Sequence, residues 1–262
     1  MEKNKSVSAC IVTYGGYREA AGGRKPSAAH NGVDLSLYLV DNASPDGTGK
    51  KLQQAQPQWG PRVQVMRLAR NMGFGAGHNA VLPVLNSKYH AVVNPDITLD
   101  EDAIGKLCAF LDEHPDVVMA TPQLLFPNGT PQYTAKRAPG FLSLLARQVP
   151  LACLKKNGRA LFDVGRRPHR AKRNWDFCTG CFFFVVRTDV FRQMQGFDEG
   201  YFMYVEDADI TRKAQSYGKV YFTPCTHVYH AWHRSPNKSL KPFFQQISSM
   251  LRYWRKWGFR LR

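Results

Sequence analysis

Short apolar runs alternate with polar, turn-forming stretches along the first half of the chain. The runs are rich in Val, Ile, Leu and Tyr, and most of them end at or near Gly, Pro, Asn or Asp. Apolar segments of this length between turn residues are typical of buried strands. The pattern predicts strands over residues 7–13, 35–41, 63–68, 90–93 and 117–121.

Helical patterns lie between these predicted strands. Apolar residues recur at helical spacing in residues 102–113, and shorter helical stretches occupy residues 50–56 and 78–85. A glycine-rich loop covers residues 71–77, and the first crossover, residues 17–34, holds a Gly-Gly pair and a proline, so we expect its helix to be short or broken. This alternation predicts an α/β fold: a mostly parallel, Rossmann-like central sheet flanked by helices.

The second half of the chain begins with a weaker pattern. Residues 126–174 are punctuated by prolines, and residues 155–173 carry eight Lys or Arg with Asp163 as their acid, which indicates a basic loop. Beyond it the pattern predicts a strand over 175–187, a short helix over 188–194, short strands over 220–222 and 227–229, and a closing amphipathic helix over 240–258.

Charge is the unusual property of the composition. The 262 residues include 36 Lys and Arg against 20 Asp and Glu, a net charge of +16. Such an excess favours an anionic partner, which is a nucleic acid, an anionic membrane surface or a phosphorylated substrate. A basic nucleic-acid-binding protein is therefore our alternative from another class, although the basic residues are not interleaved with a platform of stacking aromatics.

Targeting signals and cysteine usage favour a cytoplasmic protein. The first residues lack the apolar core of a signal peptide, and the apolar run at residues 178–186 is shorter than the ~20 residues of a membrane-spanning helix. Six cysteines are dispersed through the chain, which suits a reducing compartment. We interpret the lone Cys-x-x-Cys at residues 178–181 as the start of a buried strand.

Polar residues follow several predicted strands directly. Thr13, Asp41 and Asp96 each end or follow a strand, at the sheet edge where α/β proteins bind ligands. Asp96, in the sequence Asn-Pro-Asp, is a carboxylate suited to a hard divalent cation that also contacts a diphosphate, although such a tripeptide is equally typical of a turn. His230 and His233 are further candidates for that cation, or else ordinary surface or core residues.

An acidic triplet opens a predicted helix after an aromatic segment. Glu206, Asp207 and Asp209 follow residues 196–205, which include Phe197, Tyr201, Phe202 and Tyr204. Carboxylates against an apolar wall have raised proton affinity and are suited to general-base chemistry. The alternative is that these acids only complement the helix dipole.

These motifs follow one another in a recognisable order. They are Ile-Val-Thr-Tyr at 11–14, Val-Asp-Asn-Ala-Ser at 40–44, Arg-Asn-Met-Gly-Phe-Gly at 70–75, Asn-Pro-Asp at 94–96, Gly-Phe-Asp at 196–198, Glu-Asp-Ala-Asp at 206–209 and Val-Tyr-His at 228–230. Over residues 7–235 the chain resembles family 2 glycosyltransferases of the GT-A fold, and is most similar to bacterial rhamnosyltransferases of O-antigen and capsule assembly. Asn94 departs from the family pattern, since it stands where the first acid of a DxD motif is usual.

The resemblance implies a role for each matching residue. Asp207 is implied as the catalytic base with Glu206 as its support, and Asp96 and His230 as the residues at a Mg²⁺ or Mn²⁺ ion. Contacts to the nucleotide sugar are implied for Thr13, Tyr14, Asp41, Asn42, Arg70, Asn71, Gly75 and Asn94.

The resemblance also implies an activity and an organisation. It implies inverting transfer of a sugar, best matched by L-rhamnose from dTDP-L-rhamnose, to a lipid-diphosphate-linked saccharide at the inner face of a bacterial cell membrane. UDP-hexose and UDP-galactofuranose stay open as donors. We expect a catalytic domain over residues 1–235, with a nucleotide-sugar half over 1–97 and an acceptor half over 98–235. The basic helix of residues 236–262 either binds an anionic membrane or packs on that domain.

Overall fold

A computed structural model describes most of the chain. It covers residues 6–21, 33–132, 135–136, 173–174, 178–179, 183–231 and 240–259. The basic loop of residues 155–173, apart from Arg173, and His233 lie outside the described residues, so the expectations for them stay predictions.

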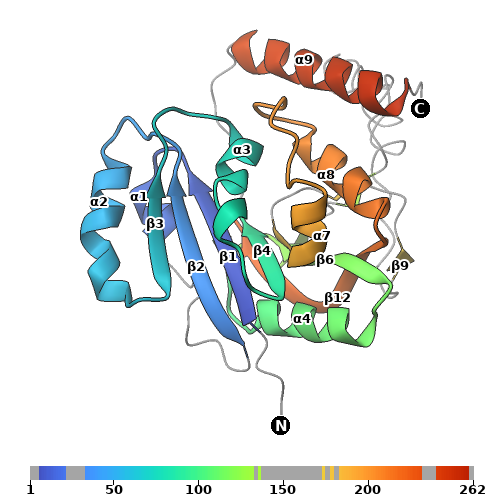
Figure 1. The fold of residues 1–262 in the computed structure, drawn as a ribbon, viewed down its shortest axis with the longest axis horizontal. Helices are drawn as coiled ribbons and strands as arrows, with labels where there is room; N and C mark the ends of the chain where they lie inside the picture. Colours follow the sequence, from blue (N-terminus) through green and yellow to red (C-terminus); the bar gives the residue numbers. More distant parts are fainter. Residues whose placement is uncertain are drawn as a thin grey trace.

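The described strands form one large mixed sheet (Figure 1). A separate sheet has two strands. The order of the large sheet is β3-β2-β1-β4-β11-β6-β12-β5, with β7 paired to β6 and β9 paired to β12. The strands are β1 Ser6–Thr13, β2 Asp34–Asp41, β3 Val63–Arg67, β4 Tyr89–Val93, β5 Ile97–Thr98, β6 Val117–Leu125, β7 Pro131–Gln132, β9 Arg173–Asn174, β11 Phe183–Arg187 and β12 Lys219–His230. The small sheet pairs β8 Ala135–Lys136 with β10 Cys178–Thr179.

Strand direction brings the predicted polar residues to one edge. β1 pairs in parallel with both β2 and β4, and Thr13 lies opposite Asp41. β11 runs antiparallel to β4 and to β6, and β6 is parallel to β12, so β12 runs in the same direction as β1. The ends of β1, β2, β4 and β12 therefore lie at the same edge, with β11 as a reversed strand among them.

Helices cover both faces of the sheet, as the alternating pattern predicted. They are α1 Tyr17–Ala21, α2 Thr48–Ala55, α3 Phe74–Asn79, α4 Ala103–Glu113, α7 Thr188–Gln193, α8 Glu206–Gln215 and α9 Leu240–Trp257, with 3-10 turns η1 Gln56–Trp59 and η2 Leu82–Val84. Successive residues of β1 alternate between two cores, since side chains alternate along a strand. One core packs against α1, α2 and α4. The other packs against α7, α8 and the segment that follows α3.

Three local expectations were wrong in detail. The single strand expected over residues 175–187 contains two strands, β10 of the small sheet and β11 of the large sheet. Residues 220–222 and 227–229 belong to one continuous strand, β12, with a register irregularity between Thr223 and His227. Pro224 lies within that irregularity; proline cannot donate to a ladder, so a bulge accommodates it and the sequence pattern is interrupted there. The glycine-rich loop already becomes helical at Phe74, and the expected helix over 78–85 is the end of α3 followed by η2.

Candidate active site

Asp41 ends β2 as a buried carboxylate. It is 1% exposed, its Oδ1 accepts a hydrogen bond of 3.3 Å from the Ser44 amide, and its Oδ2 lies 3.8 Å from Arg67 Nε. Gly49, in the first turn of α2, lies so close that a Cβ there would be 2.1 Å from Asp41 Oδ2. The glycine therefore lets the N-terminal turn of α2, where free amides favour negative charge, lie against this carboxylate.

Asn42 connects the end of β2 to the glycine-rich loop. Its Nδ2 donates to Asn71 Oδ1 and to the Gly73 carbonyl, both at 3.0 Å, and its Oδ1 accepts from the Met72 amide at 2.9 Å. These bonds hold the loop that the sequence predicted to cover a nucleotide sugar. Tyr14, at the end of β1, is 57% exposed at this edge.

Thr13 and Arg70 lie at the margins of the same edge. The buried Thr13 hydroxyl donates to the Gly15 carbonyl, and the Gly15 amide donates to Ser44 Oγ at 2.7 Å. Arg70 is exposed, and its Nε donates to the Met72 sulfur at 3.1 Å. The structure thus brings Thr13, Asp41, Asn42 and Asn71 into one connected group beside an exposed guanidinium.

The glycines of this loop permit close packing against residues 197–202. A Cβ on Gly73, which has φ +89°, would lie 2.4 Å from the Phe202 carbonyl oxygen, and one on Gly75 would lie 2.7 Å from the Phe197 Cβ. The Phe74 amide donates to the Phe202 carbonyl at 3.2 Å. The glycine-rich loop and the aromatic segment before α8 are therefore in direct contact.

Asp96 and His230 form a second group. The turn after β4 leads into β5, whose Ile97 pairs with His230 of β12. His230 Nε2 lies 3.1 Å from Asp96 Oδ2, and the Ala231 amide donates to the Asp96 carbonyl at 3.2 Å. The two residues that the resemblance assigned to a metal are thus side by side, although 134 positions separate them in the chain.

Gln132 fixes the orientation of the His230 ring. Its Nε2 donates to the carbonyls of His230 and Leu125, at 2.7 and 3.3 Å, so its Oε1 faces His230 Nδ1 at 2.8 Å. An amide oxygen accepts, so Nδ1 carries the proton and Nε2 is directed at Asp96. Sequence reasoning missed Gln132, because it lies in a proline-punctuated segment without a recognisable motif.

The donor atoms here fit a divalent cation completed by substrate oxygens. A carboxylate and an imidazole whose second nitrogen is hydrogen-bonded are typical ligands of such ions. Asn94 Oδ1, two residues before Asp96, is buried and has no hydrogen-bond partner among the described residues. No cluster of three or more His, Cys, Asp or Glu with metal-site geometry occurs in that part of the chain. Diphosphate oxygens would therefore have to provide further ligands.

Glu206 and Asp207 open α8 after a strained backbone segment. Tyr204 and Val205 have φ values of 71° and 69°, in the left-handed region that a β-branched residue rarely adopts. Asp207 Oδ1 accepts from the Ala208 amide at 2.8 Å, which is the local hydrogen bonding expected of an acid in a first helical turn. Strain of this kind occurs where the surrounding structure imposes a conformation.

Glu206 has an unusual environment for a carboxyl group. Its Oε2 is buried and has no hydrogen-bond partner among the described residues. Burial, and then the charge of Asp207, raises the pKa of Glu206 to about 8. Near neutral pH Glu206 is therefore mostly protonated and adds little negative charge beside Asp207.

Asp209 does not act only on the helix dipole. It is completely buried, its Oδ1 accepts from Trp257 Nε1 at 2.7 Å, and its Oδ2 accepts from Lys256 Nζ at 2.9 Å. Tyr201 Oη donates to the same carboxylate at 3.4 Å. Asp209 thus attaches α8 to the C-terminal helix, a role for which the sequence offers no local signal.

The C-terminal helix has one packed face and one exposed face. Ser249, Met250 and Tyr253 are buried, whereas Phe244 and Phe259 are 64% and 62% exposed. Within the part of the chain that the structure describes, no helix is long and apolar enough to cross a bilayer. Packing on the domain therefore accounts for one face of α9 and leaves the other open.

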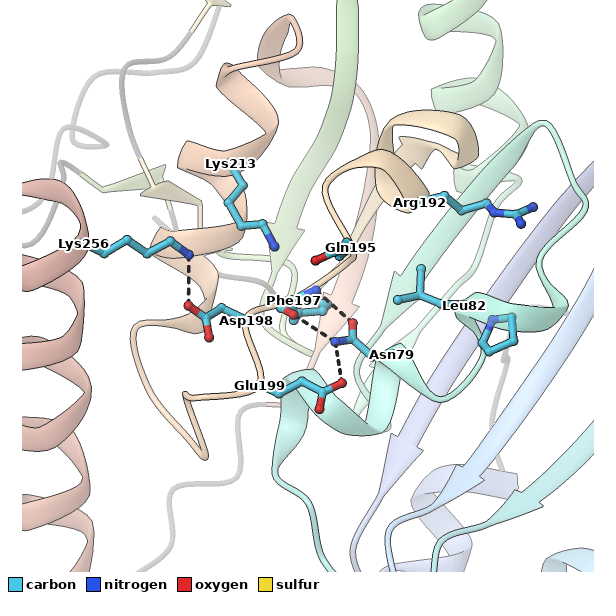
Figure 2. Close-up of a pocket in the computed structure, with 10 residues that line it drawn as sticks. Asn79, Leu82, Arg192, Gln195, Phe197, Asp198, Glu199, Lys213 and Lys256 are labelled. Atoms are coloured by element: carbon cyan, nitrogen blue, oxygen red, sulfur yellow. Dashed lines mark hydrogen bonds and ion pairs between the residues drawn. The ribbon is translucent and has the colours of Figure 1, made fainter.

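A cavity of about 720 Å³ is lined in part by residues 197–199. Figure 2 shows its lining, with Asn79 from α3, Arg192 from α7, Lys213 from α8 and Lys256 from α9. None of the sequence-predicted site residues lines it.

The sequence model for Glycosyl transferase family 2 matches residues 27–194, more than half of the chain. The chain belongs to glycosyl transferase family 2. This match includes Asp41, Asn42 and Asp96, begins after Thr13 and Tyr14, and ends before the acidic triplet of α8.

A curated relative of this family 2 chain has a name from polysaccharide assembly. Succinoglycan biosynthesis protein ExoO of Rhizobium meliloti (strain 1021) is 27% identical over 107 residues, which are 41% of this chain and 30% of the relative. The family 2 chain thus matches less than a third of that protein's length.

Solved structures confirm the GT-A-like fold. GalNAc-T7 with UDP, GalNAc and Mn²⁺ has a TM-score of 0.68 at 18% identity, over 98% of this chain and 49% of that one. The mannosyltransferase PcManGT from Pyrobaculum calidifontis, in complex with GDP-Man and Mn²⁺, has a TM-score of 0.61 at 12% identity, over 95% and 63%. At these identities the likeness concerns the fold of the family 2 chain.

The raised pKa of Glu206 predicts a pH-dependent effect on stability. The usual pKa of a Glu side chain is 4.5, and that of Glu206 in the folded chain is about 8. Between these two pH values the folded chain keeps the Glu206 proton, whereas the unfolded chain releases it. The contribution to stability is therefore full at low pH and is lost as pH rises to about 8. The free energy of unfolding of Glu206→Gln should equal that of the parent at pH 4.5. At pH 8 it should be larger by up to a few kcal/mol, at ~1.4 kcal/mol per pKa unit.

Urea unfolding at several pH values measures this difference. Glu113→Gln, at the exposed end of α4, is the matched control. An advantage of Glu206→Gln that does not grow with pH would contradict the raised pKa of Glu206.

Removing Gln132 should weaken metal binding. Gln132→Leu takes away the acceptor on His230 Nδ1, so we expect Mn²⁺ affinity in the presence of a nucleotide diphosphate to fall about 10-fold or more. Calorimetric titration with Mn²⁺ measures the effect. Gln54→Leu, at an exposed position of α2, is the control. Equal losses in both variants would show that His230 orientation is unimportant.

Proposed function

We propose that this family 2 chain is an inverting, metal-dependent glycosyltransferase that moves a sugar from a nucleotide diphosphate to an acceptor hydroxyl. The observation that carries the proposal is the Asp96–His230 pair, at the sheet edge that also holds Thr13 and Asp41. In this proposal residues 1–235 form the catalytic domain, with its donor half over 1–97 and its acceptor half over 98–235.

The reaction requires charge control at two places. A divalent cation, Mg²⁺ or Mn²⁺, held by Asp96 and His230 would neutralise the departing diphosphate. Asp207 takes the proton from the acceptor hydroxyl while the hydroxyl oxygen attacks the anomeric carbon. The bond from that carbon to the diphosphate breaks on the opposite side. Glu206, protonated near neutral pH, places no second negative charge beside that base.

Our proposed donor is dTDP-L-rhamnose, and our proposed acceptor is a lipid-diphosphate-linked saccharide. The motif order of residues 7–235, including Asn94 in place of an acid, supports the rhamnosyl assignment. The two structural neighbours were solved with different sugars and nucleotides, UDP with GalNAc and GDP-Man. UDP-hexose and UDP-galactofuranose are accordingly the alternative donors.

We further propose that the chain works in the cytoplasm, bound peripherally to the inner face of the bacterial cell membrane. Phe244, Leu251 and Phe259 are exposed on or just beyond α9, and the chain has a net charge of +16. Exposed aromatic side chains and excess positive charge suit the interface of an anionic bilayer. A lipid-linked acceptor would be available at that surface.

Asp207→Asn tests the reaction. The amide cannot accept the acceptor proton, so we expect kcat for sugar transfer to fall by a factor of 10² or more, about the size of a general-base contribution. Binding of the nucleotide sugar, measured by calorimetry with Mn²⁺, should change less than about two-fold, since Asp207 is assigned to the acceptor side.

A panel of dTDP, UDP and GDP sugars, each tested with the parent chain for donor hydrolysis, identifies the donor.

Asp189→Asn, in the first turn of α7, is the matched control for the change of Asp207 to an amide. Undiminished transfer by Asp207→Asn would remove Asp207 as the base. Strongly salt-dependent RNA or DNA binding, without stabilisation by any sugar nucleotide, would favour the nucleic-acid alternative.

Changing the exposed apolar residues tests membrane binding. A chain with Phe244, Leu251 and Phe259 all changed to Ser should lose at least about 10-fold in binding to vesicles rich in phosphatidylglycerol, since each buried apolar side chain contributes ~1.5–3 kcal/mol. Co-sedimentation with the vesicles measures the bound fraction.

The control carries Val84→Ser and Tyr217→Ser, two residues that are 47% and 45% exposed outside α9. Substitution is preferable to deletion of α9, because deletion would also remove the buried side chains that pack on α8. Equal vesicle binding by the triple variant and the control would contradict the membrane proposal.

A further inference from the structure

Residues 196–205 connect α7 to α8 and are held from two sides. On one side Asn79 of α3 donates to the Phe197 carbonyl at 2.9 Å and to Glu199 Oε1 at 3.0 Å, and accepts from the Phe197 amide at 2.9 Å. Figure 2 shows the other side, where Lys256 of α9 meets Asp198. The segment that leads to Asp207 is therefore clamped between α3 and α9.

Lys256 makes two contacts with this part of the molecule. Its Nζ lies 3.0 Å from Asp198 Oδ2 and 2.8 Å from Asp209 Oδ1. Asp198 belongs to the connecting segment and Asp209 to the first turns of α8, so one ammonium group joins both. The Trp257 indole donates to Asp209 as well, at 2.7 Å.

These ion pairs are protected from solvent on the acidic side. Asp209 is completely buried, and the Asp198 side chain is 15% exposed. Arg252 adds a 2.6 Å contact to Asp198, and together with Lys256 it holds the pKa of Asp198 at about 2, against the cost of burial. A buried charge left without its partner is strongly unfavourable, so these contacts fix where α9 can lie.

The packing contacts of α9 bracket the strained backbone. Ser249 Oγ donates to the Met203 carbonyl at 2.8 Å, immediately before Tyr204, and Tyr253 packs in a buried cluster with Tyr201 and Ala208. The left-handed residues Tyr204 and Val205 lie between these anchored positions.

A left-handed non-glycine residue costs on the order of 1–3 kcal/mol and persists where its surroundings impose it. Besides the hydrogen bond from the Phe74 amide to the Phe202 carbonyl, the described contacts that hold the chain before and after residues 204–205 include those from α9. Without them, the strain provides a driving force for the first turn of α8 to relax.

From this arrangement we propose that α9 is a positioning element of the active site: Lys256 and Trp257, through Asp209, hold the first turn of α8 so that Asp207 faces the acceptor hydroxyl. The inference rests on the proposed function, and it gives α9 a task separate from membrane binding. Its residues act through Asp209 and α8, so they are positioning residues.

Kinetics with a water-soluble acceptor, in the absence of lipid, test the proposal. Lys256→Met should lower kcat about 10- to 100-fold, the range expected when a catalytic group is misplaced by up to 1 Å, while KM for the nucleotide sugar stays within about two-fold. Arg255→Met, one residue earlier on the exposed side of α9, should match the parent.

Rescue and hydrogen exchange separate positioning from a loss of folding. Lys256→Arg keeps the charge and should recover most of kcat, and all variants should retain the far-UV circular dichroism of the parent. Amides of residues 206–209 should exchange at least about five-fold faster in Lys256→Met than in Arg255→Met.

The outcomes distinguish this inference from the proposed function. A parent that transfers no sugar refutes the proposed function, and the exchange comparison then decides alone whether α9 holds α8. Equal kcat in Lys256→Met and Arg255→Met, or equal exchange at residues 206–209, overturns the positioning role. A selective loss in Lys256→Met with rescue by Lys256→Arg supports it.

Discussion

Parallel pairing of β1 with β2 and β4 is the constraint on which the site depends. It places the ends of these strands at one edge. Because β11 is antiparallel to both β4 and β6, and β6 is parallel to β12, β6 and β12 run in the same direction as β1. His230, at the end of β12, therefore meets Asp96 of the turn after β4. Residues from opposite halves of the chain thus share one edge because strand direction is preserved across the sheet.

Much of this edge could be predicted from the sequence. Buried strands alternate with helices in a regular way, so their succession along the chain was readable from apolar runs and turn residues. The positions of Thr13, Asp41 and Asp96, at or shortly after strand ends, were readable from the same pattern. The pairing of Asp96 with His230 came from the motif resemblance, because spacing alone places no limit on which distant histidine meets a carboxylate. The continuity of β12 was missed because Pro224 breaks the pattern without ending the strand.

Contacts made by single side chains over long separations were not predictable. Gln132 and Asp209 carry no motif, and each owes its role to a partner brought close by tertiary packing. For Asp209 the local signal favoured a helix-dipole role, yet the partner lies 47 residues later in α9. Amphipathic periodicity likewise identified α9 as a helix but could not determine which of its residues would be covered.

The contact between the glycine-rich loop and the segment before α8 has a consequence for how such enzymes diversify. Gly73 and Gly75 approach Phe202 and Phe197 so closely that neither segment accommodates a larger residue at these positions unless the other changes. A loop exchanged between relatives would therefore need its companion segment to come with it. The two segments, more than 100 residues apart in the sequence, must therefore be exchanged together, both in laboratory chimaeras and in natural recombination.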